Sequence, residues 1–153
     1  MKRSSKEDAT RAHMKKMASR MKQYEKMTFL ERYGIFMAKA QIVEMLLKQN
    51  LIDERDYKLK AVENCPLGPL IKLLKKEKIN GLLLFCLKDL CEHRNYLAHE
   101  FLANQILLMA ILEERADEYS KPSRQLQLAL LSVEQFLLNY EAVPAKLRWM
   151  IVD

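Results

Sequence analysis

The sequence predicts an all-α protein, an up-and-down bundle of five or six helices. Only three glycines and four prolines occur among 153 residues, so there is little turn chemistry for β-hairpins. Apolar residues instead recur three and four positions apart over most of the chain. The length fits one domain with a sizeable core.

The first two helices are predicted at residues 5–26 and 28–48. Ser4 or Ser5 opens the first helix, and Thr28 with Glu31 forms a capping box at the start of the second. Gly34 indicates close helix approach, and Asn50 is expected to end the second helix. The first helix has one narrow apolar edge, suited to peripheral packing or a partner: Met14, Met17, Met21 and Tyr24.

The middle of the chain is predicted to hold two short helices and one long one. Residues 53–55 begin a charged third helix that ends near Asn64, and the break at 65–69 precedes a fourth. Asn80-Gly81 is either a hinge or the start of the fifth helix, which continues, straight or kinked, to about Tyr119.

The last helix is predicted over residues 124–140, after a turn and cap at 120–123. Pro144 ends it, and the segment containing Trp149 folds back over one end of the bundle. Its inward-facing positions are apolar at helical spacing: Leu126, Ala129, Leu130, Val133, Phe136 and Leu137.

The net charge of +6 lies entirely in residues 1–26. This segment has nine basic and three acidic residues, which leaves 17 basic and 17 acidic residues in the rest of the chain. We therefore separate a basic N-terminal helix or arm (1–26) from the bundle domain (27–153). A solvated surface helix explains the same charge equally well. If the arm binds RNA, the candidate residues are Arg11, Lys15, Lys16, Arg20 and Lys22.

The cysteine count and the length of the apolar runs indicate where in the cell the protein is expected to be. Cys65, Cys86 and Cys91 are an odd number, and we interpret them as reduced thiols of a cytoplasmic protein. No apolar run is long enough to cross a bilayer and no signal peptide is recognisable. We expect no membrane association.

The most informative stretch is residues 89–102, in the fifth helix. Apolar residues at three- and four-residue spacing form a stripe along this segment. The spacing predicts a leucine at position 94, but the residue there is Arg94. A guanidinium there needs an anion, a carboxylate or access to water. In an α-helix Arg94 and His99 are roughly 140° apart, so joint action on one phosphate needs a distorted helix or a second copy. The stripe consists of Leu83, Leu87, Leu90, Leu97 and Phe101.

The segment Arg94-Asn95-Tyr96-Leu97-Ala98-His99 resembles the R-x4-6-H motif of the HEPN superfamily, whose members are helical bundles that usually dimerise. Many are metal-independent endoribonucleases of toxin–antitoxin and abortive-infection defence systems. The resemblance implies that Arg94 and His99 are catalytic, with Asn95 and Glu92 in support, and that RNA is the substrate of a homodimer. It also implies a cognate antitoxin or regulatory protein. Phe101 stands where toxins with a nucleotidyltransferase antitoxin carry a tyrosine, which disfavours an antitoxin of that kind.

The chemistry needs no metal or other cofactor, because RNA supplies its own 2′-hydroxyl nucleophile. Histidine can act as acid or base near neutral pH, and arginine can stabilise charge on a phosphate. A zinc site from Cys91, His93 and His99 has no common ligand spacing. Three alternatives stay open: Arg94 pairs with a carboxylate such as Asp89 or Glu92, His99 bonds Asn95, or the domain is a non-catalytic nucleotide-binding or protein-interaction module.

Overall fold

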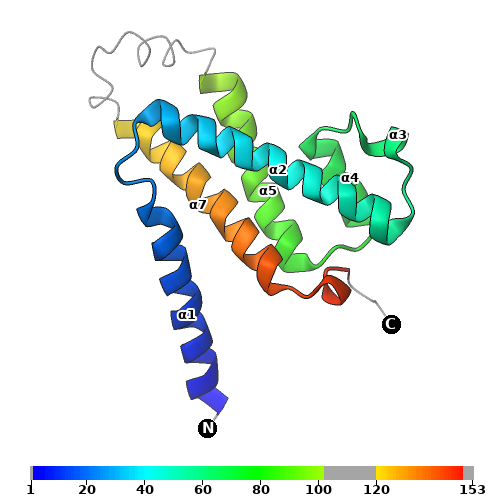
Figure 1. The fold of residues 1–153 in the computed structure, drawn as a ribbon, viewed down its shortest axis with the longest axis horizontal. Coiled ribbons are helices and arrows are strands. Elements are labelled where there is room, and N and C mark those ends of the chain that lie inside the picture. The colour runs from blue at the N-terminus through cyan, green and yellow to red at the C-terminus, as the bar shows by residue number, and fades with distance from the viewer. Residues whose placement is uncertain (1, 102–119, 150–153) are drawn as a thin grey trace.

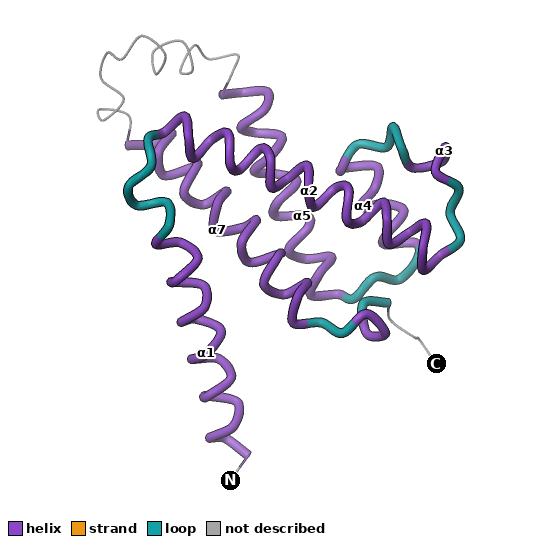
Figure 2. The backbone as a smooth tube through the Cα atoms, in the orientation of Figure 1, coloured by secondary structure: helices purple, strands orange, loops and turns teal. Residues whose placement is uncertain are grey.

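The computed structural model describes residues 2–101 and 120–149, and their regular secondary structure is helical throughout (Figures 1 and 2). The coarse prediction of a helical bundle is confirmed. A single bridge, between Ile79 and Trp149, is the only β-type pairing in this part of the chain. The elements are α1 (Lys2–Lys22), α2 (Phe29–Arg55), α3 (Leu59–Val62), α4 (Leu67–Lys76), α5 (Gly81–Asn95), a π-helix η1 (Tyr96–Phe101), α7 (Ser120–Ala142) and a 3-10 turn η3 (Ala145–Leu147).

Helix α7 is the element on which the bundle is assembled. It packs against α5, α2 and α1, while α4 packs against α5 and α2 (Figure 1). The predicted inward positions of α7 are confirmed, since all are buried except Leu137, which is half-buried. The α5 stripe is confirmed as core by Leu83, Leu87, Leu90 and Leu97, each 0% exposed.

Two predicted helix starts are confirmed by their capping hydrogen bonds. The Glu31 backbone N–H donates to Thr28 Oγ1 at 3.3 Å, and the Thr28 N–H donates to the Glu31 carboxylate at 2.7 Å. This is the expected capping box of α2. At α5, the Leu82 N–H donates to Asn80 Oδ1 at 3.0 Å. Local side-chain chemistry therefore sets both starts.

Helix α2 is longer than predicted. Asn50 does not end it, and residues 53–55 are its last turn instead of the start of another helix. Leu51 is fully buried, so tertiary packing carries the helix about two turns beyond the predicted end at residue 48. It ends where Asp56 takes a left-handed conformation with φ 55°. The third helix is reduced to Leu59–Val62.

Two further local predictions are wrong. Residues 120–123 belong to the first turn of α7, where a proline is tolerated because that N–H has no intrahelical acceptor. Gly34 makes no close helix approach, since a Cβ placed there would meet nothing within 4 Å. The predicted continuation of the fifth helix beyond Phe101 falls on residues 102–119, outside the described ranges.

The predicted fold-back of Trp149 is confirmed. The Asn80 N–H donates to the Arg148 carbonyl at 2.6 Å, and the Trp149 indole N–H donates to Glu54. The Arg55 guanidinium lies 4.5 Å from the centre of the Trp149 ring. These contacts close one end of the bundle, while Met150 and Ile151 lie outside the described residues.

Within the described ranges, none of the helices combines the length and apolar character needed to cross a membrane.

Candidate functional site

The Arg94–His99 segment lies where α5 changes from an α-helix to a π-helix. Arg94 and Asn95 end the α-helical part, and His99 is inside η1. A π-helix closes hydrogen bonds between residues five apart, so its turn is wider than that of an α-helix. The wider turn reduces the angle between Arg94 and His99 below the roughly 140° of an ideal α-helix. A distorted helix was one of the two arrangements expected to let Arg94 and His99 act on one phosphate, and the helix is distorted at this position.

Arg94 is half-buried, between the buried Leu90 and Leu97 of the same stripe. Its Nη1 donates to Asn95 Oδ1 at 3.2 Å. None of the ion pairs between described side chains involves its guanidinium; the side chains of Glu100 and of residues 102–119 are outside that description. Asp89, one of the acids considered as its partner, instead lies 3.7 Å from His93 Nε2. The guanidinium is therefore oriented but not neutralised by an acid there.

The other predicted site residues line the outside of the same segment. Glu92, Asn95 and His99 are exposed. Asn95 Nδ2 donates to Cys91 Sγ at 3.6 Å, while its Oδ1 accepts from Arg94. The oxygen and the nitrogen of the Asn95 amide therefore each have a hydrogen-bond partner other than His99. Burial raises the pKa of the Cys91 thiol, which the Arg94 charge partly offsets, so Cys91 is a neutral neighbour. The structure brings Arg94 and Asn95 into contact and leaves the His99 ring open to solvent.

The apolar stripe around Arg94 needs no second copy to cover it. Its four described leucines are already buried against other helices of the same chain. This corrects one ground for expecting a dimer at that face. A second copy would have to pack on a different surface.

The basic N-terminal helix α1 packs along α7, as its narrow apolar edge predicts. Met17 and Tyr24 are buried, whereas Met14 is 66% exposed. The partner-binding edge considered from sequence is thus largely occupied within the chain. Of the five candidate RNA-binding residues, Arg20 is committed to Glu134 at 3.3 Å and Glu141 at 2.6 Å. The other four are exposed: Arg11, Lys15, Lys16 and Lys22.

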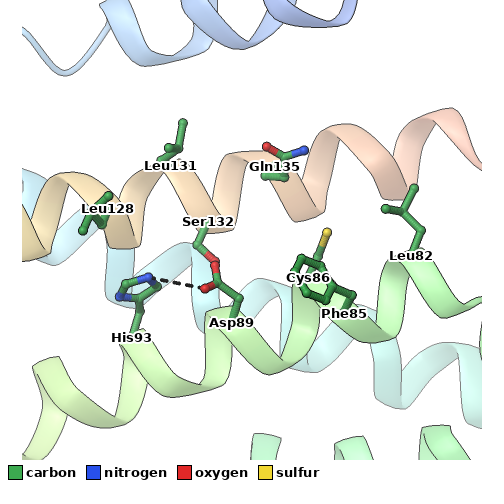
Figure 3. A pocket seen from close by; sticks show the side chains of 9 residues that line it. All are labelled: Leu82, Phe85, Cys86, Asp89, His93, Leu128, Leu131, Ser132 and Gln135. Carbon is green, nitrogen blue, oxygen red and sulfur yellow. Dashed lines mark ion pairs between the residues drawn. The ribbon is translucent and has the colours of Figure 1, made fainter. Parts of the chain in front are cut away.

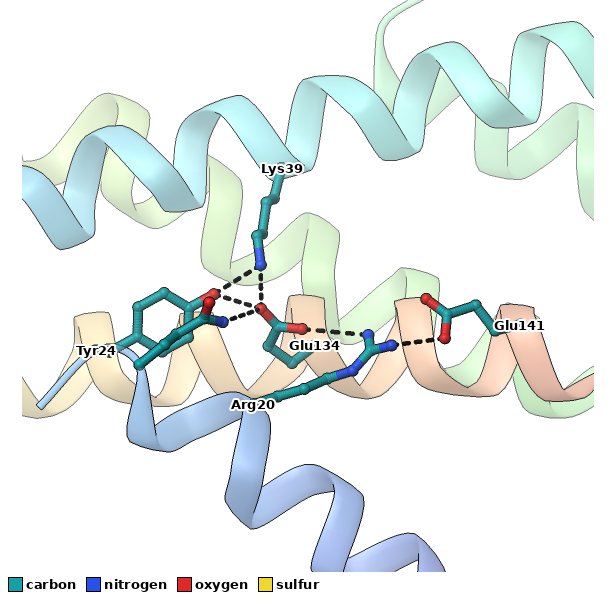
Figure 4. A network of polar contacts seen from close by, with 6 residues as sticks. Arg20, Tyr24, Lys39, Glu134 and Glu141 are labelled. Atoms are coloured by element: carbon teal, nitrogen blue, oxygen red, sulfur yellow. Dashed lines mark hydrogen bonds and ion pairs between the residues drawn. The ribbon is translucent and has the colours of Figure 1, made fainter.

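Sequence reasoning missed a buried polar network centred on Glu134 in α7 (Figure 4). This carboxylate is 1% exposed and accepts hydrogen bonds from Lys39, Tyr24, Arg20 and Gln23. Burial alone would raise the pKa of Glu134, but bonds from Lys39 and Tyr24, with the Lys39 and Arg20 charges, outweigh it and lower that pKa. The sequence does contain a signal for this network, because Glu134 is an acidic residue on the inward face of the helix that also carries Leu130, Val133 and Leu137.

The network joins three helices that are far apart in sequence. Arg20 and Gln23 come from the end of α1 and the turn after it, Lys39 from α2, and Glu134 from α7. Burial, and then the hydrogen bond to Glu134, raise the pKa of Tyr24, so its phenol stays protonated. Every polar atom of the Glu134 carboxylate is thereby satisfied, which identifies the cluster as an anchor for α1.

Among the residues that the structure describes, no group of three or more His, Cys, Asp or Glu side chains is arranged to hold a metal ion. Comparison of the chain with protein-family models, with curated proteins and with solved structures found no match.

Proposed function

We propose that this chain is a metal-independent endoribonuclease of the HEPN type, with Arg94 and His99 as its catalytic pair. The observation that carries the proposal is the state of Arg94: a half-buried guanidinium that donates to Asn95 and forms no ion pair with any acidic side chain that the structure describes. An exposed histidine follows five residues later across a π-helical turn. Such an arginine is suited to a phosphate ligand.

The chemistry is an internal transesterification of the RNA backbone. His99 accepts the proton of the 2′-hydroxyl while its oxygen attacks the adjacent phosphorus. The bond from phosphorus to the 5′-oxygen breaks, and that oxygen takes a proton from water. Arg94 forms hydrogen bonds to the phosphate oxygens, where negative charge increases in the transition state. The products are a 2′,3′-cyclic phosphate and a free 5′-hydroxyl.

Asn95 and Glu92 have supporting roles in this proposal. Asn95 Oδ1 accepts from Arg94, so Asn95 is a positioning residue that fixes the guanidinium. Glu92 is exposed about two helical turns before His99, and in this proposal it supports the pair through its negative charge. The exposed basic residues of α1 (Arg11, Lys15, Lys16 and Lys22) would contact RNA phosphates without reading sequence.

The biological setting is part of the same proposal: a cytoplasmic toxin or abortive-infection component, held in check by a cognate antitoxin or regulatory protein. Expression of the wild-type chain should then arrest growth. Arg94→Ala and His99→Ala should each relieve the arrest. Harmless expression of the wild type alongside tight co-purification of one partner would favour the non-catalytic interaction module instead.

The direct test is a cleavage assay on a mixed RNA pool with EDTA present. Wild type should cleave and leave 2′,3′-cyclic phosphate ends, whereas Arg94→Ala and His99→Ala should lose activity with unchanged circular dichroism. Arg94→Lys should be strongly impaired, because an ammonium keeps the charge but not the two-pronged donor geometry. Arg124→Ala, an exposed arginine of α7, is the matched control and should cleave like wild type. Full activity in both alanine variants would disprove the assignment.

A further inference from the structure

A hollow of about 350 Å³ lies between α5 and α7 (Figure 3). This volume is at the small end of the range of small-molecule pockets, roughly 300–1,000 Å³. Most of its wall is apolar, and Phe85 on one side is 71% exposed. The hollow is therefore suited to a small organic molecule with an apolar body. We call it the α5–α7 hollow, and its apolar side chains are Leu82, Phe85, Leu128 and Leu131.

One buried polar group of the hollow has no partner in the described part of the chain. Ser132 of α7 is 6% exposed, and its hydroxyl forms no hydrogen bond there. Its side chain points from α7 toward Asp89 of α5, into the hollow (Figure 3). Buried hydroxyl groups are usually hydrogen-bonded, because an unpaired one costs free energy. The Ser132 oxygen is thus available to accept a hydrogen bond from a molecule in the hollow.

The acidic group of the hollow is the Asp89 carboxylate. It is 51% exposed and lies 3.7 Å from Nε2 of His93, which also lines the hollow. That separation is an ion-pair distance but is longer than a hydrogen bond. The carboxylate can therefore still accept hydrogen bonds from a ligand.

No other described side chain of the lining supplies a charge of either sign. Burial raises the pKa of the Cys86 thiol, and its Sγ accepts a hydrogen bond from Asn139 Nδ2 at 3.3 Å, so Cys86 stays a neutral part of the wall. The Gln135 amide lies 3.5 Å from the ring of His13 in α1. Lysine and arginine are absent from the described lining, so the hollow has a carboxylate for a cation and no permanent positive charge for an anion.

We propose that the α5–α7 hollow binds a small organic ammonium compound, in which an apolar body carries one amino group. An ammonium group has three N–H donors and no acceptor. One N–H donates to the Asp89 carboxylate and another to the Ser132 hydroxyl oxygen, which points toward that carboxylate (Figure 3). Both hydrogen bonds are strengthened by the charge of the donor. The apolar body packs against Phe85 and the leucines of the hollow.

Other classes of small molecule fit this arrangement less well. A neutral alcohol can hydrogen-bond to Ser132, but it leaves Asp89 without a positive charge on the ligand. A carboxylate or a phosphate is repelled by Asp89 and finds no lysine or arginine in the described lining. The proposal is independent of RNA cleavage, because it uses neither Arg94 nor His99.

The test is an NMR titration of the ¹⁵N-labelled full chain with 2-phenylethylamine at pH 7.5, where alkylamines carry their proton. The amine should cause saturable shifts in amide signals around Asp89 and Ser132, with a Kd on the order of 1 mM, as for other ligands of this size. The matched neutral ligand is 2-phenylethanol, which has the same apolar body. It should bind about tenfold more weakly, because the charge-assisted hydrogen bond to Asp89 is missing.

Three variants assign the effect to the two acceptors. Asp89→Asn should bind the amine and the alcohol equally, and Ser132→Ala should bind the amine several-fold more weakly than wild type does. Asp53→Asn makes the same chemical change at an exposed acid of α2, outside the hollow, and should behave like wild type. Unchanged circular dichroism controls for the fold of each variant. The proposal is overturned if wild type shows no saturable shifts up to about 20 mM amine. It is also overturned if wild type binds the two ligands equally, or if Asp89→Asn keeps the preference for the amine.

Discussion

The clearest quantitative prediction concerns the two ion pairs of Arg20. Its contact with Glu141 is the shorter, 2.6 Å against 3.3 Å for Glu134. Glu141, however, is 59% exposed, whereas Glu134 is 1% exposed and also holds Lys39 and Tyr24. Water therefore reaches the Glu141 carboxylate freely, whereas the Glu134 carboxylate is shielded from it. We therefore expect the longer contact to stabilise the fold more.

The magnitude follows from what Glu134→Gln leaves behind. Removing one partner of a fully buried ion pair costs about 3–5 kcal/mol, because the other charge stays buried. Lys39 and Arg20 are 26% and 27% exposed, so they regain part of their hydration. We expect Glu134→Gln to lower the free energy of unfolding by about 2–3 kcal/mol. Glu141→Gln removes a screened pair and should cost less than about 1 kcal/mol.

The assay is urea unfolding followed by far-ultraviolet circular dichroism, with both variants beside wild type. The difference between wild type and Glu134→Gln should also depend on pH. Because the pKa of Glu134 is lowered in the folded chain, its contribution is complete above the ordinary value of 4.5 and is lost as the pH falls through the folded pKa. An equal or larger cost for Glu141→Gln, or a Glu134→Gln deficit that persists in strong acid, would refute the reasoning.

Three further changes test other parts of the structure. Thr28→Ala removes the cap of α2 and should cost about 1 kcal/mol in urea unfolding. Ser132→Ala removes a buried, unpaired hydroxyl and should raise the free energy of unfolding by about 1 kcal/mol; a loss would mean that the hydroxyl is bonded in solution. Lys15→Ala with Lys16→Ala should reduce the dependence of RNA binding on salt concentration by about two in slope, without loss of stability. An unchanged slope would remove α1 from the RNA-binding surface.

The sequence predicts the parts of this fold that depend on local chemistry or strong periodicity. The α5 stripe and the Thr28–Glu31 capping box could both be predicted because their partners lie within one or two helical turns. The end of α2 could not be predicted, because Asp53-Glu54-Arg55 is compatible with the end of a helix as well as with its start. Burial of Leu51 against distant residues determines that the helix continues. The prediction of a turn at residues 120–123 was wrong because the sequence alone does not distinguish a proline in the first turn of a helix from a proline in a loop.

The sequence is enough to propose the residues of the candidate site but not their geometry. The spacing of Arg94 and His99 indicates the motif, and the structure adds the π-helical turn that reduces the angle between them. No periodicity argument yields that turn, because it changes the hydrogen-bonding register of the backbone without changing which residues are apolar. The Glu134 network was missed because all its partners lie 95 or more residues away in the sequence.

Arg94 and Glu134 present the same signal in the sequence, a charged residue on an inward-facing helical stripe. In the structure their side chains have different kinds of partner. Glu134 is surrounded by donors from α1 and α2, so its charge is balanced within the chain and its role is to anchor α1. Arg94 is held by an amide, which orients a guanidinium without neutralising it. A half-buried guanidinium that pairs with no described acidic side chain is left to water or to an anionic ligand. That contrast, together with the exposed His99 on the next turn, is why we propose a role in chemistry for Arg94 and a role in stability for Glu134.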